Sequence, residues 1–277
     1  MADTTKVFVV LDPTSMEQPS LVWGEKIALD MKEHRSLTVQ LHVYCCIDPA
    51  EGAAAGDDGA QAASLKSVAE WLERMVTHTR AQGIPVETEV EAEAQWRQAI
   101  VNAAQRINCN VVIKNLTQHS RLVRLVRETA DWQLLRDCHC PVLLVKTGKE
   151  YGINKILVAV KHTEDDAYKA ANTSMLDSAK RLADDLGASV HAVTCYQSDD
   201  RPDRQRFADS CGLERSQVTA AMGTPEKVIA SVAEEVEADL LVIARVARPE
   251  SAGMLGDTAR KVIDEIATDV LVLPMTR

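Results

Sequence analysis

The clearest indication of the fold comes from Asp239-Leu-Leu-Val-Ile-Ala244, followed by Gly253-Met-Leu-Gly256-Asp257 in a loop and then by Asp269-Val-Leu-Val-Leu-Pro274. The two short apolar runs are typical of strands that are buried on both faces. The order strand, helix, strand predicts a βαβ unit with parallel strands, whose first loop lies where open α/β sheets bind ligands. The residues between the runs recur at the spacing of one helix face: Ala259, Val262, Ile263, Ile266 and Ala267.

The same patterns extend over the rest of the chain. A loop rich in Ala, Gly and Asp is expected at Glu51–Ala63, followed by a helix over residues 65–79. Gly83 and Gly187 are expected to end helices. The predicted strands of the first half are Lys6–Asp12, Leu37–Cys46, Val86–Val90, Val111–Asn115 and Val142–Lys146, and those of the second half before Asp239 are Lys155–Val160, Ala188–Cys195 and Gln217–Ala221.

The chain contains an internal repeat. Lys6 and Lys155 begin the first strand of each copy, 149 positions apart, and the same offset pairs His42 with His191. Further along the offset is 129, which relates residue 110 to Asp239 and also pairs Cys140 with Asp269. The sequence therefore predicts two α/β domains, residues 1–149 and 150–277, each with a five-stranded parallel sheet and helices on both faces.

Composition excludes several classes of protein. The chain has 277 residues, of which 46% are hydrophobic, so both domains can bury a core. The net charge of −10 argues against nucleic-acid binding, which needs surplus Lys and Arg. No apolar run approaches the ~20 residues of a membrane span, and no signal segment is recognised. Seven cysteines without framework spacing indicate reduced thiols, as expected in the cytoplasm.

Several motifs carry a family resemblance. The second copy contains Ile156-Leu-Val-Ala-Val160, Gly223-Thr-Pro225 and Leu255-Gly256, and the first contains Asp131-Trp132-Gln-Leu-Leu-Arg136-Asp-Cys-His-Cys140-Pro141-Val-Leu-Leu-Val145. Across essentially its whole length the chain resembles the tandem form of the universal stress protein family. The resemblance implies the strand order 3-2-1-4-5 in each domain. It also implies a pseudo-dimer in which the last strands, Val142–Lys146 and Val270–Leu273, pair, and it leaves a further homodimer open.

The resemblance implies how nucleotide-binding members hold ATP. They carry an Asp after the first strand and a loop of the form G-x-x-G, followed by G-S or G-T. Glycines allow phosphate oxygens to approach backbone N–H groups at a helix start, which a Cβ would block. The first copy keeps Asp12, but its loop Lys114-Asn-Leu-Thr-Gln-His-Ser-Arg121 contains no glycine.

The second copy departs further from that pattern. Lys161 stands where the Asp belongs, and the loop Arg245-Val-Ala-Arg-Pro-Glu250 lacks the glycine pair. Of the final pair only Gly256 remains, and Asp257 follows where Ser or Thr would contact phosphate. We therefore expect that neither copy binds ATP in the family's manner.

Other candidate residues have competing interpretations. Asp12 could bind a base edge, as the family implies, or cap the following turn. His42 is interpreted as a core or cleft histidine. The triplet Arg121, Arg124 and Arg127 could hold an anionic group, although a solvated basic edge explains it better. The candidate ligand-binding residues are therefore Asp12, His42, Arg121, Arg124, Arg127, Gly253 and Gly256.

The run Cys138-His139-Cys140 suggests a metal site, because thiolates and imidazoles bind zinc. Zinc needs four ligands, or three and a water, and no second Cys/His pair has finger spacing. A cysteine that enters a buried strand is ordinarily a small apolar residue. We therefore expect a structural role and no metal.

The sequence contains no G-x-S-x-G elbow, no H-E-x-x-H motif and no Walker loop, and we find no catalytic constellation in it. The sequence favours a non-catalytic cytoplasmic stress-response protein that needs no cofactor and binds a small ligand or a protein partner at the strand ends. The alternative is an ATP-binding signalling module with weak ATPase activity. A third interpretation is a structural dimerisation scaffold.

Overall fold

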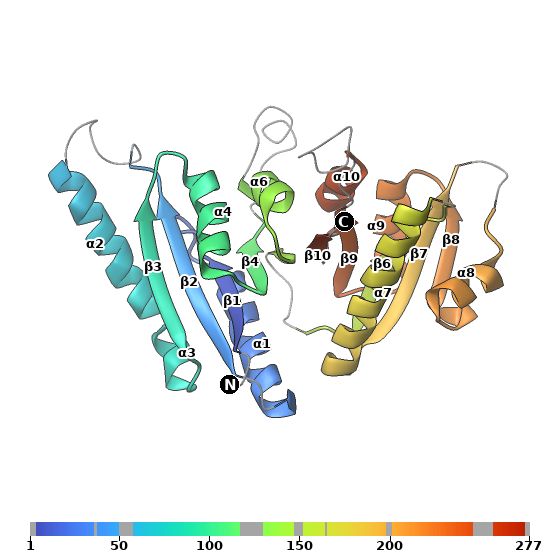
Figure 1. Ribbon diagram of the computed structural model, residues 1–277, viewed down its shortest axis with the longest axis horizontal. Coiled ribbons are helices and arrows are strands. Elements are labelled where there is room, and N and C mark those ends of the chain that lie inside the picture. The colour runs from blue at the N-terminus through green and yellow to red at the C-terminus, as the bar shows by residue number, and fades with distance from the viewer. Residues whose placement is uncertain are drawn as a thin grey trace. The chain divides into compact units, whose positions relative to one another are not determined.

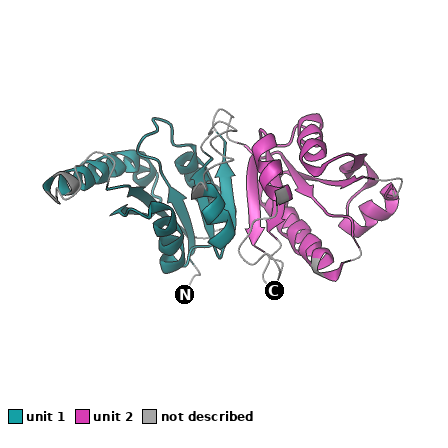
Figure 2. Ribbon diagram, turned by 90° about the horizontal axis from the view of Figure 1, so that it is seen from above, with its two compact units in different colours: residues 1–149 teal, residues 150–277 magenta. Residues whose placement is uncertain are grey.

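The protein forms two compact units, Met1–Lys149 and Glu150–Arg277 (Figure 2). Each unit is an α/β domain built on one five-stranded parallel sheet. The computed structural model describes residues 4–35, 38–49, 58–116, 130–146, 152–163, 165–197, 201–245 and 257–274.

The sheet of the first unit has the strand order β3-β2-β1-β4-β5, with every neighbouring pair parallel (Figure 1). Helix α1 contacts β1, β2 and β4, while α4 and α6 contact each other on the other face, as right-handed crossovers require. The elements are β1 (Thr5–Val10), α1 (Pro19–Arg35), β2 (Val39–Ile47), α2 (Asp58–Met75), α3 (Thr77–Ala81), β3 (Val86–Ala92), α4 (Trp96–Ile107), β4 (Val111–Asn115), α6 (Ala130–Asp137) and β5 (Val142–Val145).

The sheet of the second unit has the order β10-β9-β6-β7-β8, the same topology as the first. Helix α7 contacts β6 and β9, and α9 contacts α10. The elements are β6 (Lys155–Ala159), α7 (Asp166–Leu186), β7 (Ser189–Tyr196), α8 (Arg204–Cys211), a 3-10 turn η1 (Arg215–Gln217), β8 (Val218–Met222), α9 (Pro225–Glu235), β9 (Leu240–Arg245), α10 (Asp257–Glu265) and β10 (Asp269–Pro274). The predicted fold class and the order 3-2-1-4-5 are therefore confirmed.

Strand register confirms the repeat. Phe8 pairs with His42 in the first unit, and Leu157 pairs with His191 in the second, which preserves the offset of 149. Buried apolar strands lie at the centre of both sheets, as the run Asp239–Ala244 predicted. Val7, Phe8, Val9, Leu241 and Val242 are all completely buried.

The offset at the last strands needs correction by one residue. Val112 pairs with Val142, and the corresponding Leu241 pairs with Val270. Val142 therefore corresponds to Val270, so Cys140 corresponds to Thr268 and not to Asp269. The connection before β10 is one residue shorter than the connection before β5.

Two parts of the element prediction were wrong. Helix α2 begins at Asp58, so the expected loop ends before Ala63, because the alanines there continue a helix. Helix α8 was missed because its sequence is mostly polar. Its signals are local: the Asp203 side chain accepts a hydrogen bond from the backbone N–H of Arg206, and Gly212 ends the helix with a φ of 58°.

Candidate functional site

The carboxyl edge of the first sheet includes Asp12, which lies two residues after β1. Its Oδ1 accepts hydrogen bonds from the backbone N–H of Thr14 at 2.9 Å and from the Thr14 hydroxyl at 2.6 Å. The backbone N–H of Ser15 donates to the carbonyl of Asp12 at 3.1 Å. This is how an aspartate stabilises a tight turn. The structure shows the capping role, and a role in ligand binding stays a prediction.

Gln18 and Asn115 connect this turn to the start of α1. Gln18 donates to the carbonyl of Asp12 at 2.5 Å and accepts from the backbone N–H of Asp12 at 3.2 Å. The buried Asn115 accepts through Oδ1 from the backbone N–H of Ser20 at 2.7 Å. Ser20 is in the first turn of α1, where N–H groups have no partner within the helix. The side-chain amide of Asn115 therefore occupies the backbone N–H group of Ser20, which is a donor of the kind that binds anions at helix starts.

Lys114 precedes Asn115 on β4, and its charge is neutralised inside the protein. Its Nζ lies 2.8 Å from Oδ1 of Asp131 in the first turn of α6, and the two side chains are only 11% and 5% exposed. The same Nζ donates to the carbonyl of Asn115 at 3.0 Å. This lysine is thus held within the protein and is not presented to an anionic ligand.

Lys161 occupies the position of Asp12 in the second unit. Its Nζ lies 3.6 Å from the ring centroid of Tyr168, a cation–π contact. Asn172 on α7 brackets the backbone of Lys161: its Nδ2 donates to the Lys161 carbonyl at 2.8 Å, and its Oδ1 accepts from the Lys161 N–H at 3.3 Å. The carboxyl edge of this sheet therefore carries a fixed cation where the first unit carries a carboxylate.

His42 lies in the middle of β2 and not at the carboxyl edge. It pairs in register with Phe8, four residues before Asp12, which is about 13 Å along the strand. Its Nε2 lies 2.8 Å from Glu89 and its Nδ1 lies 3.3 Å from Glu87, both on β3. The structure therefore does not bring His42 and Asp12 into one site.

The remaining candidates cannot be placed. Arg121, Arg124, Arg127, Gly253 and Gly256 all lie outside the described residues.

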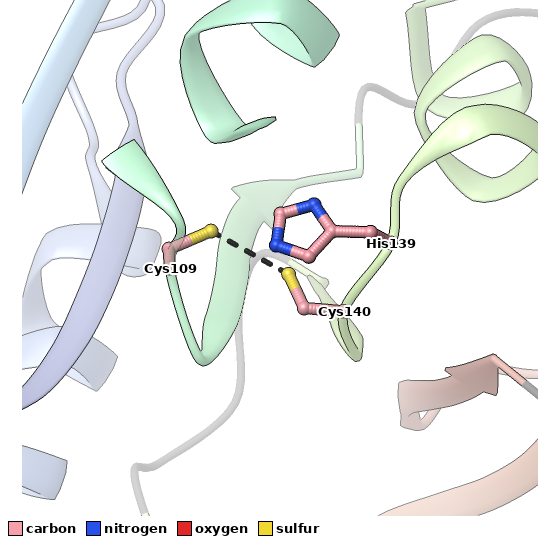
Figure 3. A group of neighbouring side chains, drawn as sticks. All are labelled: Cys109, His139 and Cys140. Carbon is pink, nitrogen blue, oxygen red and sulfur yellow. Dashed lines mark hydrogen bonds between the residues drawn. The ribbon is translucent and has the colours of Figure 1, made fainter. Parts of the chain in front are cut away.

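A second cluster lies at the opposite, amino edge of the first sheet (Figure 3). Cys109 is in the turn between α4 and β4, and His139 and Cys140 are in the turn between α6 and β5. One ligand atom from each of the three lies within 4.8 Å of the other two. The sulfur atoms of Cys109 and Cys140 are 3.4 Å apart, and Cys138 Sγ lies 3.5 Å from Cys140 Sγ.

Local structure explains how Cys109 reaches this place. Helix α4 ends at Ile107, and the capping residue Asn108, which is left-handed with a φ of 51°, turns the chain toward β4. Strands β4 and β5 are neighbours, and the N–H of Val112 donates to the carbonyl of Pro141 at 2.9 Å. The contact with Cys109 raises the pKa of Cys140 to about 12.

Sequence reasoning found Cys138, His139 and Cys140 but missed Cys109. A signal was available, because Cys109 and Cys140 both stand two residues before a buried strand. Once β4 and β5 are expected to be adjacent, those two positions meet at one edge of the sheet.

The sequence profile of the Universal stress protein family matches residues 4–146 and 198–274. The chain belongs to the universal stress protein family. The two matched segments show that it is a tandem member, and this membership places the chain among stress-response proteins.

Similar family members match the chain over nearly its whole length. The Universal stress protein E homolog of Haemophilus influenzae is 26% identical over 96% of this chain and 96% of its own length. Universal stress protein E of Escherichia coli is 26% identical over 99% of this chain and 95% of its own. The chain is therefore a tandem universal stress protein similar to universal stress protein E.

Solved structures of universal stress proteins share the fold. A putative member from Pseudomonas aeruginosa superimposes with a TM-score of 0.73 at 25% identity, and 97% of this chain and 92% of that chain are covered. A member from Archaeoglobus fulgidus gives a TM-score of 0.71 at 18% identity, with coverage of 97% and 96%. Among the described residues, no helix is both long enough and apolar enough to cross a bilayer.

Proposed function

We propose that the chain is a non-catalytic, cytoplasmic stress-response protein that binds a small ligand or a protein partner at the carboxyl edges of its sheets. It needs no cofactor, and neither repeat binds ATP in the manner of the family's nucleotide-binding members. Pairing of the repeats through their last strands, a further homodimer and the lack of nucleic-acid binding stay predictions.

The observation that carries the proposal is the contact between Lys161 and Tyr168. A carboxylate at this position accepts hydrogen bonds from a nucleoside, whereas an ammonium group has donors only. Because Tyr168 and Asn172 hold Lys161 in place, accommodating a nucleoside there requires breaking these contacts. The fixed cation favours an anionic ligand of a different shape at the second unit.

The first unit gives independent support. The Asp12 carboxylate, the Gln18 amide and the Asn115 amide bond to the protein's own turn and to the start of α1. A ligand that competes for these donors must replace several internal hydrogen bonds, each worth about 1 kcal/mol net. The network therefore favours recognition of a partner by surface groups over a phosphate cradle of backbone N–H groups.

The alternative function, an ATP-binding module with weak ATPase activity, has one observation in its favour. Asp12 keeps the family's acidic residue and is only half-buried. If the alternative holds, binding resides in the first unit alone and depends on Asp12.

Calorimetry with Mg-ATP on the full chain tests both functions. The expected result is no measurable binding for the natural sequence or for Asp12→Ala. Tight binding that Asp12→Ala abolishes establishes the alternative and overturns the proposal. Lys161→Asp restores the acidic residue of the second unit and serves as the matched variant. Gain of ATP binding by that variant alone shows that Lys161 is what excludes the nucleotide.

A second measurement addresses the ligand itself. The purified chain is denatured, extracted and analysed by mass spectrometry. Co-purified ATP contradicts the proposal, and a different small molecule supports it. Lys161→Ala is expected to release an anionic ligand bound at the second unit, while Lys180→Ala, on the same helix as Tyr168, serves as a charge-matched control.

A further inference from the structure

We propose that Cys109, His139 and Cys140 form a zinc site at the amino edge of the first unit, with a fourth position open to water. The site is separate from the carboxyl edges and does not rest on the proposed ligand-binding function. The role that we propose for this site is the binding of zinc, and no catalytic step is assigned to it.

The geometry suits one tetrahedral ion. Zinc bonds to sulfur at about 2.3 Å and to imidazole nitrogen at about 2.0–2.1 Å, which sets two ligating sulfurs about 3.8 Å apart. Here the two sulfur atoms are 3.4 Å apart, and all three ligand atoms lie within 4.8 Å of one another. Small rotations about the side-chain torsions, which move the ligand atoms by up to about 1 Å, are enough to seat an ion among them. Figure 3 shows the His139 ring pointing toward the two sulfurs.

The surroundings of the three ligands fit a stable but accessible site. Cys109 and Cys140 are 3% and 6% exposed, whereas His139 is exposed, so the cluster is open on its imidazole side. Binding replaces one proton on each thiol by a bond to zinc, so Zn²⁺ and two thiols give a neutral zinc dithiolate and two released protons. A neutral product avoids the cost of a buried net charge.

Cys138 is not assigned as a ligand. Its Sγ lies 3.5 Å from that of Cys140, but it does not belong to the group whose ligand atoms are all within 4.8 Å. Three protein ligands with an open fourth position is a known zinc arrangement, including Cys₂His.

The second repeat shows that the fold does not require these residues. Ala238, Ala267 and Thr268 occupy the positions of Cys109, His139 and Cys140. Ala238 and Thr268 are as buried as the two cysteines, and the Thr268 hydroxyl donates to the carbonyl of Ala238 at 3.2 Å. The same turn thus packs well without sulfur or imidazole. Packing alone therefore does not account for two thiols and a histidine meeting in the first repeat.

The repeat also supplies the test variant. The triple variant Cys109→Ala, His139→Ala, Cys140→Thr introduces the residues that the second repeat uses at these positions, so we expect it to fold. The exposed His139 allows a milder variant, His139→Ala. Cys211→Ala removes a thiol that is 2% exposed on α8 in the second unit and is the matched control.

The experiment titrates the reduced, metal-free full chain with zinc in competition with a chromogenic chelator, and with cobalt(II) as a spectroscopic probe. We expect one tightly bound ion per chain and a thiolate-to-cobalt charge-transfer band. The triple variant is expected to lose both, and His139→Ala to bind roughly tenfold or more weakly. Cys211→Ala is expected to match the natural chain.

Three outcomes overturn the proposal. One is no stoichiometric binding by the reduced natural chain. Another is binding that survives in the folded triple variant, whose fold circular dichroism checks. The third is a Cys109–Cys140 disulfide that forms in air while the reduced pair takes up no metal, which makes the contact a redox pair.

Discussion

Lys114 and Asp131 form a buried ion pair between β4 and α6, with Nζ and Oδ1 2.8 Å apart. Removing one partner leaves the other charge buried without compensation, which costs about 3–5 kcal/mol. We therefore expect Lys114→Met and Asp131→Leu each to lower the free energy of unfolding by that amount in a urea titration. The double variant Lys114→Met, Asp131→Leu removes both charges and is expected to recover most of the loss. Additive losses in the double variant show that the pair is not coupled.

Gly24 and Val9 are in close contact between α1 and β1. A Cβ on Gly24 would come within 2.9 Å of Cγ2 of Val9, and Val9 is completely buried. Gly24→Ala is expected to destabilise the chain by about 1–3 kcal/mol through overpacking, although alanine is the better helix former by about 1 kcal/mol. Thermal and urea unfolding measure the change.

The contact also predicts a rescue. In the double variant Val9→Ala, Gly24→Ala, the loss of Cγ2 of Val9 makes room for the new Cβ at position 24, so Gly24→Ala costs less in the Val9→Ala background. An equal cost in both backgrounds contradicts the steric explanation.

The sequence predicted the fold well because its signals are local and repeated. The runs around Val111 and Leu241 are apolar and short, and two copies at constant offset confirm each other. Polar segments such as α8 were missed because helix formation there depends on the cap of Asp203 and on burial of Phe207, and periodicity does not detect these.

The candidate sites were less predictable because they depend on which chain segments meet. Asp12 was identified from its position, but Gln18, which bonds to it, directly precedes α1, and Asn115, which bonds to Gln18, is on β4. Cys109 is 30 positions from His139 in sequence and joins it only because β4 and β5 are adjacent. The sequence alignment of the two repeats paired Cys140 with Asp269, one residue away from its true counterpart Thr268. A shift of one residue is enough to hide which positions of the two repeats correspond.

We expect His191 on β7 to make the stability of the second unit depend on pH. Burial, followed by the charges of Arg204 and Lys155, lowers its pKa below the ordinary 6.5, while Glu235 acts in the opposite direction. The unfolded chain therefore binds more protons than the folded chain as the pH falls through 6.5. Stability from this group is present above 6.5 and is lost at lower pH.

The matched variant is His191→Gln. In the natural chain Nε2 of His191 lies 2.9 Å from the Thr219 hydroxyl, and the glutamine amide can still form a hydrogen bond with that hydroxyl. We expect the free energy of unfolding of the natural chain to fall more steeply between pH 7 and pH 5 than that of the variant. The difference in slope is less than about 1.4 kcal/mol per pH unit, the limit for one proton. Identical slopes contradict the assignment to His191.

Cys46 near the end of β2 is a half-buried thiol whose pKa is raised. Burial, together with the nearby carboxylates of Glu91 and Glu93, raises its pKa to about 11 despite a hydrogen bond with Tyr44 that opposes the shift. Because the thiolate is the nucleophile, alkylation by iodoacetamide is expected to be slow at pH 7 and to rise about tenfold per pH unit up to pH 10. Peptide mapping after timed alkylation measures the rate.

The completely buried neighbour Cys45 is the internal control, since it reacts only when the chain unfolds. Rapid labelling of Cys46 at pH 7 in the folded chain contradicts this assignment, because it requires a thiolate that the site stabilises.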